Sequence, residues 1–218
     1  MPHKLDIGCG PNKRPGYIGI DTRSCPGVDH VIDIEQERLP FPDASVSHVF
    51  SSHCLEHLKD PMQLFREIAR VAQDGAEVEI WTPYAFSNGA FMYSHLHFLA
   101  EDHYSHMCIL FPEVYKNLTG AYWNWHDLTY VVSVHTAVEI NRASVPIDFA
   151  LKYYKNVCLE FGIRMTVQKN SWSRVDPVRY VCLERNGVRY KLPPVPPIGE
   201  AEIEAYVQQL GSMSRTAE

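Results

Sequence analysis

The stretch L-D-I-G-C-G-P-N, residues 5–12, decides the fold, because it leads a short apolar run into a glycine turn. Residues 5–7 predict a buried strand, and Gly8 and Gly10 mark the turn that ends it. Glycines at the end of a strand let the main chain approach a ligand closely, since no side chain intervenes. The stretch therefore predicts a first strand that opens into a ligand-binding loop.

Four further apolar segments follow, and each ends at a turn residue or an acid. They cover residues 17–20, 28–34, 46–51 and 76–82. Before the last of them, Asp60 and Pro61 are typical of a helix start, and Asp74-Gly75 is typical of a helix end. Strands joined by crossovers predict a doubly wound, mostly parallel α/β sheet of the Rossmann-like kind. Such sheets bind ligands at the carboxyl ends of their strands.

The middle of the chain, residues 84–142, is rich in histidine and aromatic residues. We interpret it as a cap or insertion packed over the strand ends. Within this cap, short helices are expected near residues 99–107 and 111–118, and the run T-Y-V-V-S-V-H-T-A-V-E-I predicts a strand over residues 129–140.

Beyond the cap, the pattern predicts a helix over residues 149–161 and a last strand over residues 178–184. Residues 1–191 are therefore expected to form a single domain. Residues 192–218 begin with a proline-rich, extended linker and continue into a C-terminal helix and tail. This terminal segment could reach a second subunit, so a homodimer is a possible partner arrangement.

The composition excludes several classes of protein. With 218 residues, 45% of them hydrophobic, the chain can bury a proper core, and its net charge of −6 disfavours a nucleic-acid binder. Its six cysteines are scattered without a C-x-x-C pair, which is typical of reduced thiols. No segment has the roughly 18–20 apolar residues of a membrane helix, and the N-terminus has no secretory signal pattern. We expect a cytoplasmic protein with neither a membrane nor a nucleic-acid partner.

Two nucleotide-binding patterns compete for the glycine turn. The dinucleotide fingerprint G-x-G-x-x-G requires a glycine where Lys13 stands, and an acid about 20 residues further on. Here Asp21 follows Gly10 by only 11 residues. The sequence therefore disfavours NAD.

The second pattern is a resemblance to class I S-adenosylmethionine-dependent methyltransferases. It is carried by L-D-I-G-C-G-P-N-K-R-P-G-Y-I-G-I-D, V-D-H-V-I-D-I, L-P-F-P-D-A-S-V-S-H-V-F-S-S-H-C-L-E-H-L and D-G-A-E-V-E-I-W-T-P, in that order, over residues 5–83. The motif N-K-x-P-G-Y, with almost no first crossover, is similar to a short-crossover subgroup. The resemblance implies a methyltransferase fold with S-adenosylmethionine as cofactor and S-adenosylhomocysteine as product.

The resemblance also implies a set of cofactor-binding residues in the first four strand ends. They are Asp6, Gly8, Cys9, Gly10, Asp21, Thr22, Asp33, Ile34, Ser51 and His53. The glycine loop would contact the methionine part, Asp21 the ribose and Asp33 the adenine. The chemistry is reasonable, because a carboxylate can accept both hydroxyl hydrogens of a ribose diol.

The histidines of the cap are candidates for chemistry on the acceptor. Methyl transfer is an in-line displacement, so the protein mainly positions the nucleophile and excludes water. A hydroxyl acceptor gains from a nearby base, and histidine suits that task near neutral pH. We therefore expect His95, His97 and His126 to serve as bases or acceptor contacts. The expected reaction is methylation of an oxygen or nitrogen of a small-molecule or glycan-type acceptor, without a metal.

Two alternatives remain open. His53-x-x-Glu56-His57 matches H-x-x-E-H, which on a helix would place two imidazoles for a zinc metallohydrolase. The shortened first crossover is instead compatible with a scaffold that binds the cofactor without catalysis.

Overall fold

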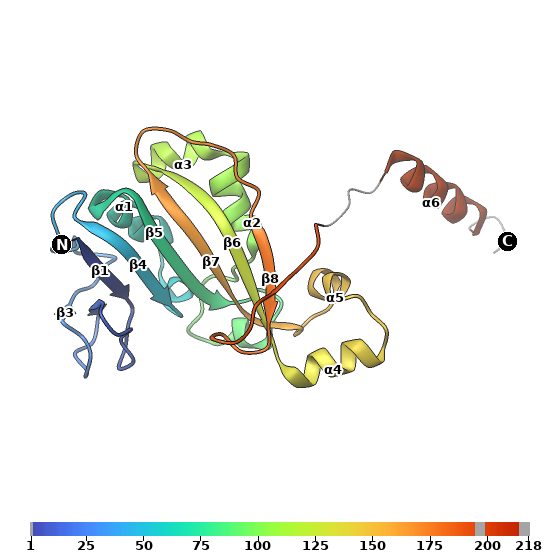
Figure 1. Ribbon diagram of the computed structural model, residues 1–218, viewed down its shortest axis with the longest axis horizontal. Coiled ribbons are helices and arrows are strands. Elements are labelled where there is room, and N and C mark those ends of the chain that lie inside the picture. The colour runs from blue at the N-terminus through green and yellow to red at the C-terminus, as the bar shows by residue number, and fades with distance from the viewer. Residues whose placement is uncertain (1, 195–198, 214–218) are drawn as a thin grey trace.

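The computed structural model describes residues 2–194 and 199–213, and within these ranges nine strands form one sheet (Figure 1). The strands are β1 (His3–Ile7), β2 (Ile18–Asp21), β3 (His30–Val31), β4 (Val46–Ser52), β5 (Ala72–Pro83), β6 (Tyr122–Val132), β7 (Cys158–Gln168), β8 (Val178–Cys182) and β9 (Tyr190–Lys191). The helices are α1 (Pro61–Val71), α2 (Glu101–Ser105), α3 (Pro112–Thr119), α4 (Val134–Arg142), α5 (Ile147–Tyr153) and α6 (Glu200–Met213). Three short turns complete the set: η1 (Leu55–His57), η2 (Asn88–Phe91) and the π-turn η3 (His106–Leu110).

The strand order is β3-β2-β1-β4-β5-β7-β6-β8-β9. Strands β1 to β5 pair in parallel, β7 runs antiparallel between β5 and β6, and β8 is again parallel to β6. The predicted mostly parallel, Rossmann-like α/β sheet is therefore confirmed. The segment 28–34, expected to form a full strand, contributes only β3.

One face of the sheet is covered by helices. Helix α1 begins as its sequence indicates, with Pro61 in the first turn and the Asp60 carboxylate accepting a hydrogen bond from the Met62 amide at 3.0 Å. It buries Phe65, whose ring packs edge-to-face on Trp123 of β6 with centroids 5.1 Å apart. Helix α3 lies beside α1 on this face. The apolar side chains of β4, β5, β6 and β7 that point this way form the main core.

The opposite face over β4, β5 and β7 has no helical layer among the described residues. Cross-strand neighbours on this face are polar: Glu77 lies opposite Thr166, and Glu79 lies opposite Arg164. The chain passes from β1 to β2 through a loop, residues 8–17, with no helix to cover the sheet. In this respect the structure differs from the doubly wound expectation, because the short crossovers leave one face open.

The cap prediction is only partly correct. Helices α2 and α3 form close to the expected positions, but α3 packs against α1 and β6 on the sheet face instead of over the strand ends. The strand expected over residues 129–140 is wrong in its bounds: β6 ends at Val132, and α4 begins at Val134. The Ser133 hydroxyl caps α4 by accepting a hydrogen bond from the Thr136 amide at 3.1 Å.

The C-terminal half shows one further difference. The helix predicted over residues 149–161 stops at Tyr153, and Asn156, with a φ of 63°, turns the chain into β7. The predicted last strand is confirmed as β8. Residues 195–198 of the proline-rich linker lie outside the described residues, and the division of the chain at residue 191 remains a prediction. Among the helices described here, none has the length and apolar character to cross a bilayer.

Candidate functional site

A cavity of about 660 Å³ opens where β1, β2, β3 and β4 end, at the carboxyl edge of the parallel strands. Its lining residues come from the glycine loop, the two acidic strand ends, the turn η1 and the loop before α2. They are Gly8, Gly10, Ile20, Asp21, Thr22, Arg23, Ile32, Asp33, Ile34, Glu35, His53, Cys54, His57, Leu58 and Ser94. The sequence thus brings seven of its ten expected cofactor residues to one cavity; the other three lie elsewhere, as described below.

Gly8 is the position where the turn requires glycine. Its φ is +70°, and a Cβ added there would lie 2.5 Å from the Cβ of Cys54. Its amide donates to the Ile20 carbonyl at 2.8 Å, which ties the loop to β2. Any side chain at this position would strain the backbone and collide with η1, so the close approach of the two segments depends on glycine.

Asp21 fixes the loop while remaining at the cavity wall. One carboxylate oxygen accepts a hydrogen bond from the Gly10 amide at 2.9 Å, and the other accepts one from the Arg23 amide at 3.0 Å. Each oxygen keeps a second lone pair for a ligand hydroxyl. The carboxylate is therefore held in place at the end of β2 and can still bind a diol.

Asp33 closes the neighbouring turn in a similar way. Its carboxylate accepts hydrogen bonds from the Glu35 amide at 3.0 Å and from the Gln36 side chain at 2.6 Å. Beside it, Ile32 and Ile34 are almost fully buried and give the cavity an apolar wall. An apolar wall with a carboxylate at its edge suits a flat, amine-bearing base.

Three expected cofactor residues do not line this cavity. Asp6 is buried behind the loop, where its carboxylate accepts a hydrogen bond from the Arg14 amide at 2.7 Å, and burial raises its pKa. Ser51 is also buried and donates its hydroxyl hydrogen to the Ile7 carbonyl at 2.9 Å. Burial, with the nearby charge of Asp6, raises the pKa of the Cys9 thiol to about 11. These residues support the loop from behind.

His53 has a role that the sequence did not indicate. Its Nε2 lies 2.8 Å from a carboxylate oxygen of Glu160 on β7, and its Nδ1 lies 3.3 Å from Glu56. Glu160 first, and Glu56 second, raise the pKa of His53 to about 9. Glu160 also pairs with Arg185 at 2.8 Å. His53 is therefore a cation at neutral pH and cannot act there as a free base.

The three histidines expected to be catalytic occupy different places. His95 packs its ring edge-to-face on His57, with centroids 4.8 Å apart, beside the cavity. His97 is also near, because its Nε2 donates to the Leu58 carbonyl at 2.8 Å. His126 lies on the open face instead, where its Nε2 is 2.9 Å from the Thr166 hydroxyl oxygen. The role expected for His126 stays a prediction, but β6 carries this side chain to the open face of the sheet, away from the cavity at the strand ends.

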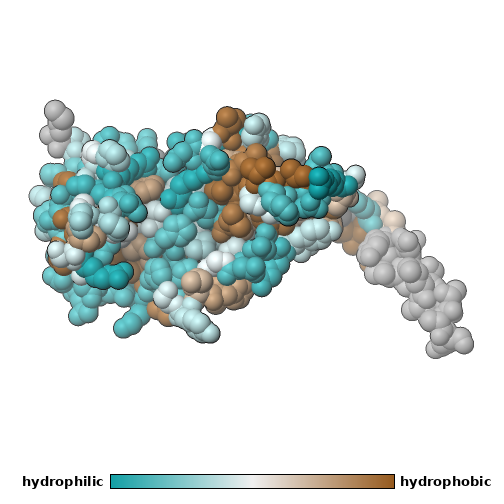
Figure 2. Space-filling model, turned by 90° about the horizontal axis from the view of Figure 1, so that it is seen from below, coloured by the Kyte–Doolittle hydropathy of each residue, from teal (hydrophilic) through white to brown (hydrophobic). Residues whose placement is uncertain are grey.

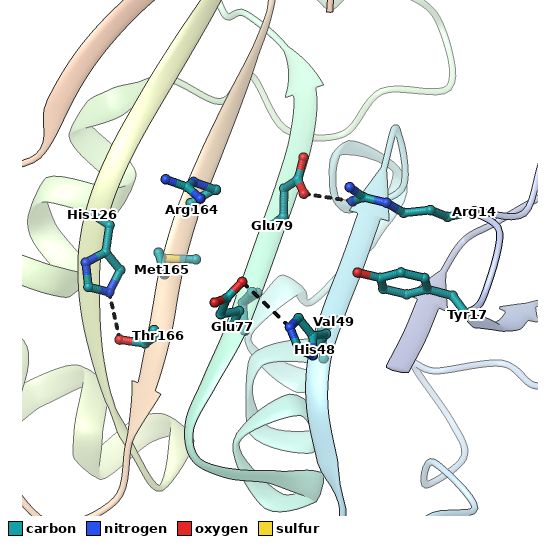
Figure 3. Close-up of a pocket in the computed structure, with 11 residues that line it drawn as sticks. Arg14, Tyr17, His48, Val49, Glu77, Glu79, His126, Arg164, Met165 and Thr166 are labelled. Atoms are coloured by element: carbon teal, nitrogen blue, oxygen red, sulfur yellow. Dashed lines mark hydrogen bonds and ion pairs between the residues drawn. The ribbon is translucent and has the colours of Figure 1, made fainter. Parts of the chain in front are cut away.

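That open face has a groove of its own, of about 450 Å³ (Figure 3). Figure 3 shows Glu77, Glu79 and His126, which project from strands, and Arg14, which comes from the loop after β1, among the side chains that line it. Arg14 pairs with Glu79 at 2.7 Å, and Arg164 pairs with Asp127. The groove lies along the middle of the strands, away from the carboxyl edge, and both of its arginines already have carboxylate partners. We therefore assign the candidate site to the cavity at the strand ends.

The H-x-x-E-H motif does not form a metalloprotease helix. Residues 55–57 make a single 3₁₀ turn, η1, and His53 precedes it with a φ of 53°. His57 points its Nδ1 to the Ser94 carbonyl at 3.0 Å, while His53 is engaged with Glu160. The structure therefore does not pair the two imidazoles as the motif would on a helix, and the metallohydrolase alternative loses its basis.

An exposed apolar surface lies in the loop after β5. Figure 2 views the molecule from below and shows hydrophobic residues gathered in one part of that face, among hydrophilic ones. The exposed large apolar residues of this loop are Phe86, Phe91, Met92, Tyr93, Leu96 and Phe98. The loop is tied to η1, because the Leu96 amide donates to the Glu56 carbonyl at 2.7 Å. An apolar surface is thus held next to the turn that borders the cavity.

The chain has an α/β fold with a cavity at the carboxyl ends of its parallel strands, and comparison with known proteins shows what part of it is similar to. Residues 21–80, from the end of β2 into β5, match the family model described as a methyltransferase domain. Ajmaline N-methyltransferase of Rauvolfia serpentina is 45% identical over 88 residues. That match covers 35% of this chain, and the chain spans only 28% of that relative's length. Over these residues the chain is therefore similar to a methyltransferase domain.

Two solved structures are among those that match the chain. The YcgJ protein of Bacillus subtilis has a TM-score of 0.49 at 15% identity, covering 78% of this chain and 93% of that one. A SAM-dependent methyltransferase of Archaeoglobus fulgidus has a TM-score of 0.49 at 18% identity, covering 76% of this chain and 86% of that one. The strand order of this chain defines its fold independently of them.

Proposed function

We propose that this chain transfers a methyl group from S-adenosylmethionine to an oxygen or nitrogen of a small-molecule or glycan-type acceptor. The observation that carries the proposal is the convergence of Asp21, Asp33 and the Gly8–Gly10 loop on one cavity. These groups come from three successive parallel strands, and their side-by-side position follows from the sheet topology.

The cavity residues fit the cofactor. Gly8 leaves main chain exposed at the cavity without a side chain, and the two carboxylates are fixed by main-chain amides. Asp21 would hold the ribose hydroxyls, and Asp33 with Ile34 would hold the adenine. When bound, S-adenosylmethionine supplies an electrophilic methyl group on a sulfonium. The cationic His53 would lie near the methionine carboxylate or an anionic acceptor and attract it.

The acceptor would enter from the side of the apolar loop after β5. Aromatic and apolar walls suit a flat or apolar acceptor, and the exposed side chains of residues 86–98 provide them. The N-methyltransferase relative supports a nitrogen acceptor as one member of the proposed class. His95 and His97 remain the proposed acceptor contacts, since both lie beside the cavity.

Calorimetry with S-adenosylhomocysteine tests the proposal. We expect the chain to bind it, and Asp21→Ala to weaken binding at least tenfold, because the ribose loses a charge-assisted partner (about 1.4 kcal/mol for each tenfold). Asp21→Asn keeps an acceptor for the Gly10 amide and separates loop collapse from loss of the ribose contact. Asp176→Ala is the matched control, since among the residues that the structure describes Asp176 pairs with the exposed Arg174 alone. Absence of any binding by the wild-type chain would refute the proposal.

A non-catalytic scaffold is the second candidate. It is favoured by the short first crossover and by the absence of helices over one face of the sheet among the described residues. The two candidates differ in turnover. Release of S-adenosylhomocysteine in the presence of a panel of amines, phenols, sugars and carboxylic acids supports the enzyme. Tight binding without turnover across the panel supports the scaffold.

A further inference from the structure

Three potential metal ligands converge beside the candidate site. One ligand atom from each of Glu56, His57 and His95 lies within 4.8 Å of the other two. Glu56 and His57 are neighbours in η1, and His95 comes from the loop before α2. His57 also lines the cavity, so the cluster borders the place where the cofactor and acceptor would meet.

The Glu56 carboxylate is the unusual member. The residue is only 1% exposed, and neither carboxylate oxygen has a hydrogen-bond partner among the described residues. His53 lies 3.3 Å away as an ion pair, but it is not aligned for a hydrogen bond and it also serves Glu160 at 2.8 Å. Because His53 is shared with Glu160 and leaves both Glu56 oxygens without an aligned hydrogen bond, this buried carboxylate still has room for a second cation or donor.

The two imidazoles are prepared as ligands by their other ring nitrogens. The Nδ1 of His57 lies 3.0 Å from the Ser94 carbonyl, and the Nδ1 of His95 lies 3.1 Å from the Ala90 carbonyl. A carbonyl oxygen can only accept, so each Nδ1 must carry the hydrogen. In the neutral ring, Nε2 is then left with a free lone pair. Histidines that bind metals are commonly held in this way by a backbone carbonyl.

The loop that carries His95 is fixed to the turn that carries Glu56. The Leu96 amide donates to the Glu56 carbonyl at 2.7 Å, and the His95 amide donates to the Met92 carbonyl at 3.0 Å. Zinc bonds of about 2.0–2.2 Å require neighbouring ligand atoms roughly 3.3–3.6 Å apart in a tetrahedron. Because the backbones are already in place, small side-chain rotations would bring the three ligands to that spacing.

We propose that Glu56, His57 and His95 bind one divalent transition-metal ion, with zinc as the cation that suits two imidazoles and a carboxylate. This set differs from the H-x-x-E-H hypothesis, because His53 is an ion-pair partner and His95 takes its place as a ligand. Three protein ligands leave a further position for water or an acceptor heteroatom. That use of the metal rests on the proposed function; the binding itself does not. With the metal bound, His95 would act on the acceptor through the ion and not as a free base.

The test is zinc titration of the untagged, chelator-treated chain by calorimetry, with elemental analysis after dialysis. We expect one zinc ion per chain, and at least a tenfold loss of affinity in His57→Ala and in His95→Ala. Glu56→Gln keeps the volume of the buried side chain and removes its charge, so it should also lose affinity. His135→Ala, an exposed histidine on α4, is the control and should bind zinc like the wild type.

A second measurement protects against variants that fail to fold. Zinc should raise the Tm of the wild type and of His135→Ala, and should not raise that of a folded His95→Ala chain. No zinc binding by the wild type, or equal binding by His95→Ala, would overturn the proposal. Loss of binding in His53→Gln, with His95→Ala unaffected, would favour the H-x-x-E-H set instead. S-adenosylhomocysteine binding measured on the chelator-treated chain keeps a failure here distinct from a failure of the proposed function.

Discussion

The two faces of the central sheet differ in the side chains that they carry: one face is apolar and buried, and the other is charged and exposed to solvent. On the helix-covered face, Val78 and Ile80 of β5 and Ile163 of β7 are at most 1% exposed and pack under the helical layer. On the open face, their immediate neighbours Glu77 and Arg164 stay in contact with solvent. Parallel sheets are usually covered on both faces. Here one face has no helical layer, and its charged side chains make it compatible with solvent.

Ion pairs organise the open face across strands. Arg164 of β7 pairs with the buried Asp127 of β6, and Arg189 pairs with the other oxygen of the same carboxylate at 2.7 Å. Nearer the strand ends, Trp81 lies against Gly162, where a Cβ would come within 2.4 Å of the indole. The Arg185 guanidinium lies 4.5 Å from the Trp81 ring. On a sheet face without a covering helix, cross-strand ion pairs and stacking of a guanidinium on a ring can thus supply side-chain contacts between strands.

The largest effect is expected on the covered face. Ile163→Ala should lower the free energy of unfolding by about 2–5 kcal/mol, because it removes buried methyl groups and leaves a cavity in a packed core. Urea denaturation measures the change. A loss below about 1 kcal/mol would mean that this face does not hold the main core.

A smaller loss of stability, and one that depends on pH, is expected when Glu67 of α1 is replaced. Its carboxylate accepts hydrogen bonds from the Leu39 amide at 2.8 Å and from Arg70 at 2.7 Å. Burial alone would raise its pKa, but these partners outweigh burial and lower the pKa below the ordinary 4.5. Its stabilising effect is therefore fully present above pH 4.5 and is lost as the pH falls through the lowered pKa.

Glu67→Gln should cost roughly 1–3 kcal/mol at neutral pH. Because the variant lacks the titrating group, the stability difference from the wild type should shrink towards about pH 3. Glu77→Gln on the open face is the control, since Glu77 is well exposed. Denaturation curves at several pH values compare the three chains. A constant difference between wild type and Glu67→Gln across that range would contradict the assignment.

The asymmetry of the faces also explains what the sequence could and could not predict. The meeting of Asp21 and Asp33 at one cavity was predictable, because the carboxyl ends of neighbouring parallel strands must lie at one edge. The alternation Glu77-Val78-Glu79-Ile80 is typical of a half-covered strand, and it was an available signal for the open face. By contrast, β6 buries every residue except His126, so it has no alternation from which its bounds could be read.

The pairing of strands that are distant in the chain could not be predicted from the sequence. Nothing local indicates that β7 inserts antiparallel between β5 and β6. This insertion brings Glu160 to His53, 107 positions away, and the ion pair raises the pKa of a residue that still lines the cavity. The same strand places Thr166 beside His126 on the open face. The surroundings of both histidines thus depend on contacts between distant segments.

Arg164→Ala provides the direct counterpart to Ile163→Ala on the neighbouring residue. Its side chain is half exposed, and Asp127 keeps Arg189 as a partner after the change. The expected loss of stability is therefore about 1 kcal/mol or less, and it should decrease further in high salt. Denaturation with and without added salt measures both. A loss as large as that of Ile163→Ala would show that the open face is as critical to the fold as the core.

The smallest loss of stability is expected for His126→Ala. This variant also tests whether the open face takes part in the proposed function. His126 is exposed, its ring bonds to the Thr166 hydroxyl, and it lines the groove along the middle of the strands. Its loss should change stability by about 0.5 kcal/mol or less. It should leave the affinity for S-adenosylhomocysteine unchanged, because the cofactor cavity lies at the strand ends. His97→Ala is the comparison, since His97 lies beside that cavity. If His126→Ala weakened cofactor binding or turnover more than His97→Ala did, the open face would have to be part of the active site, and the contrast between the two faces would no longer hold.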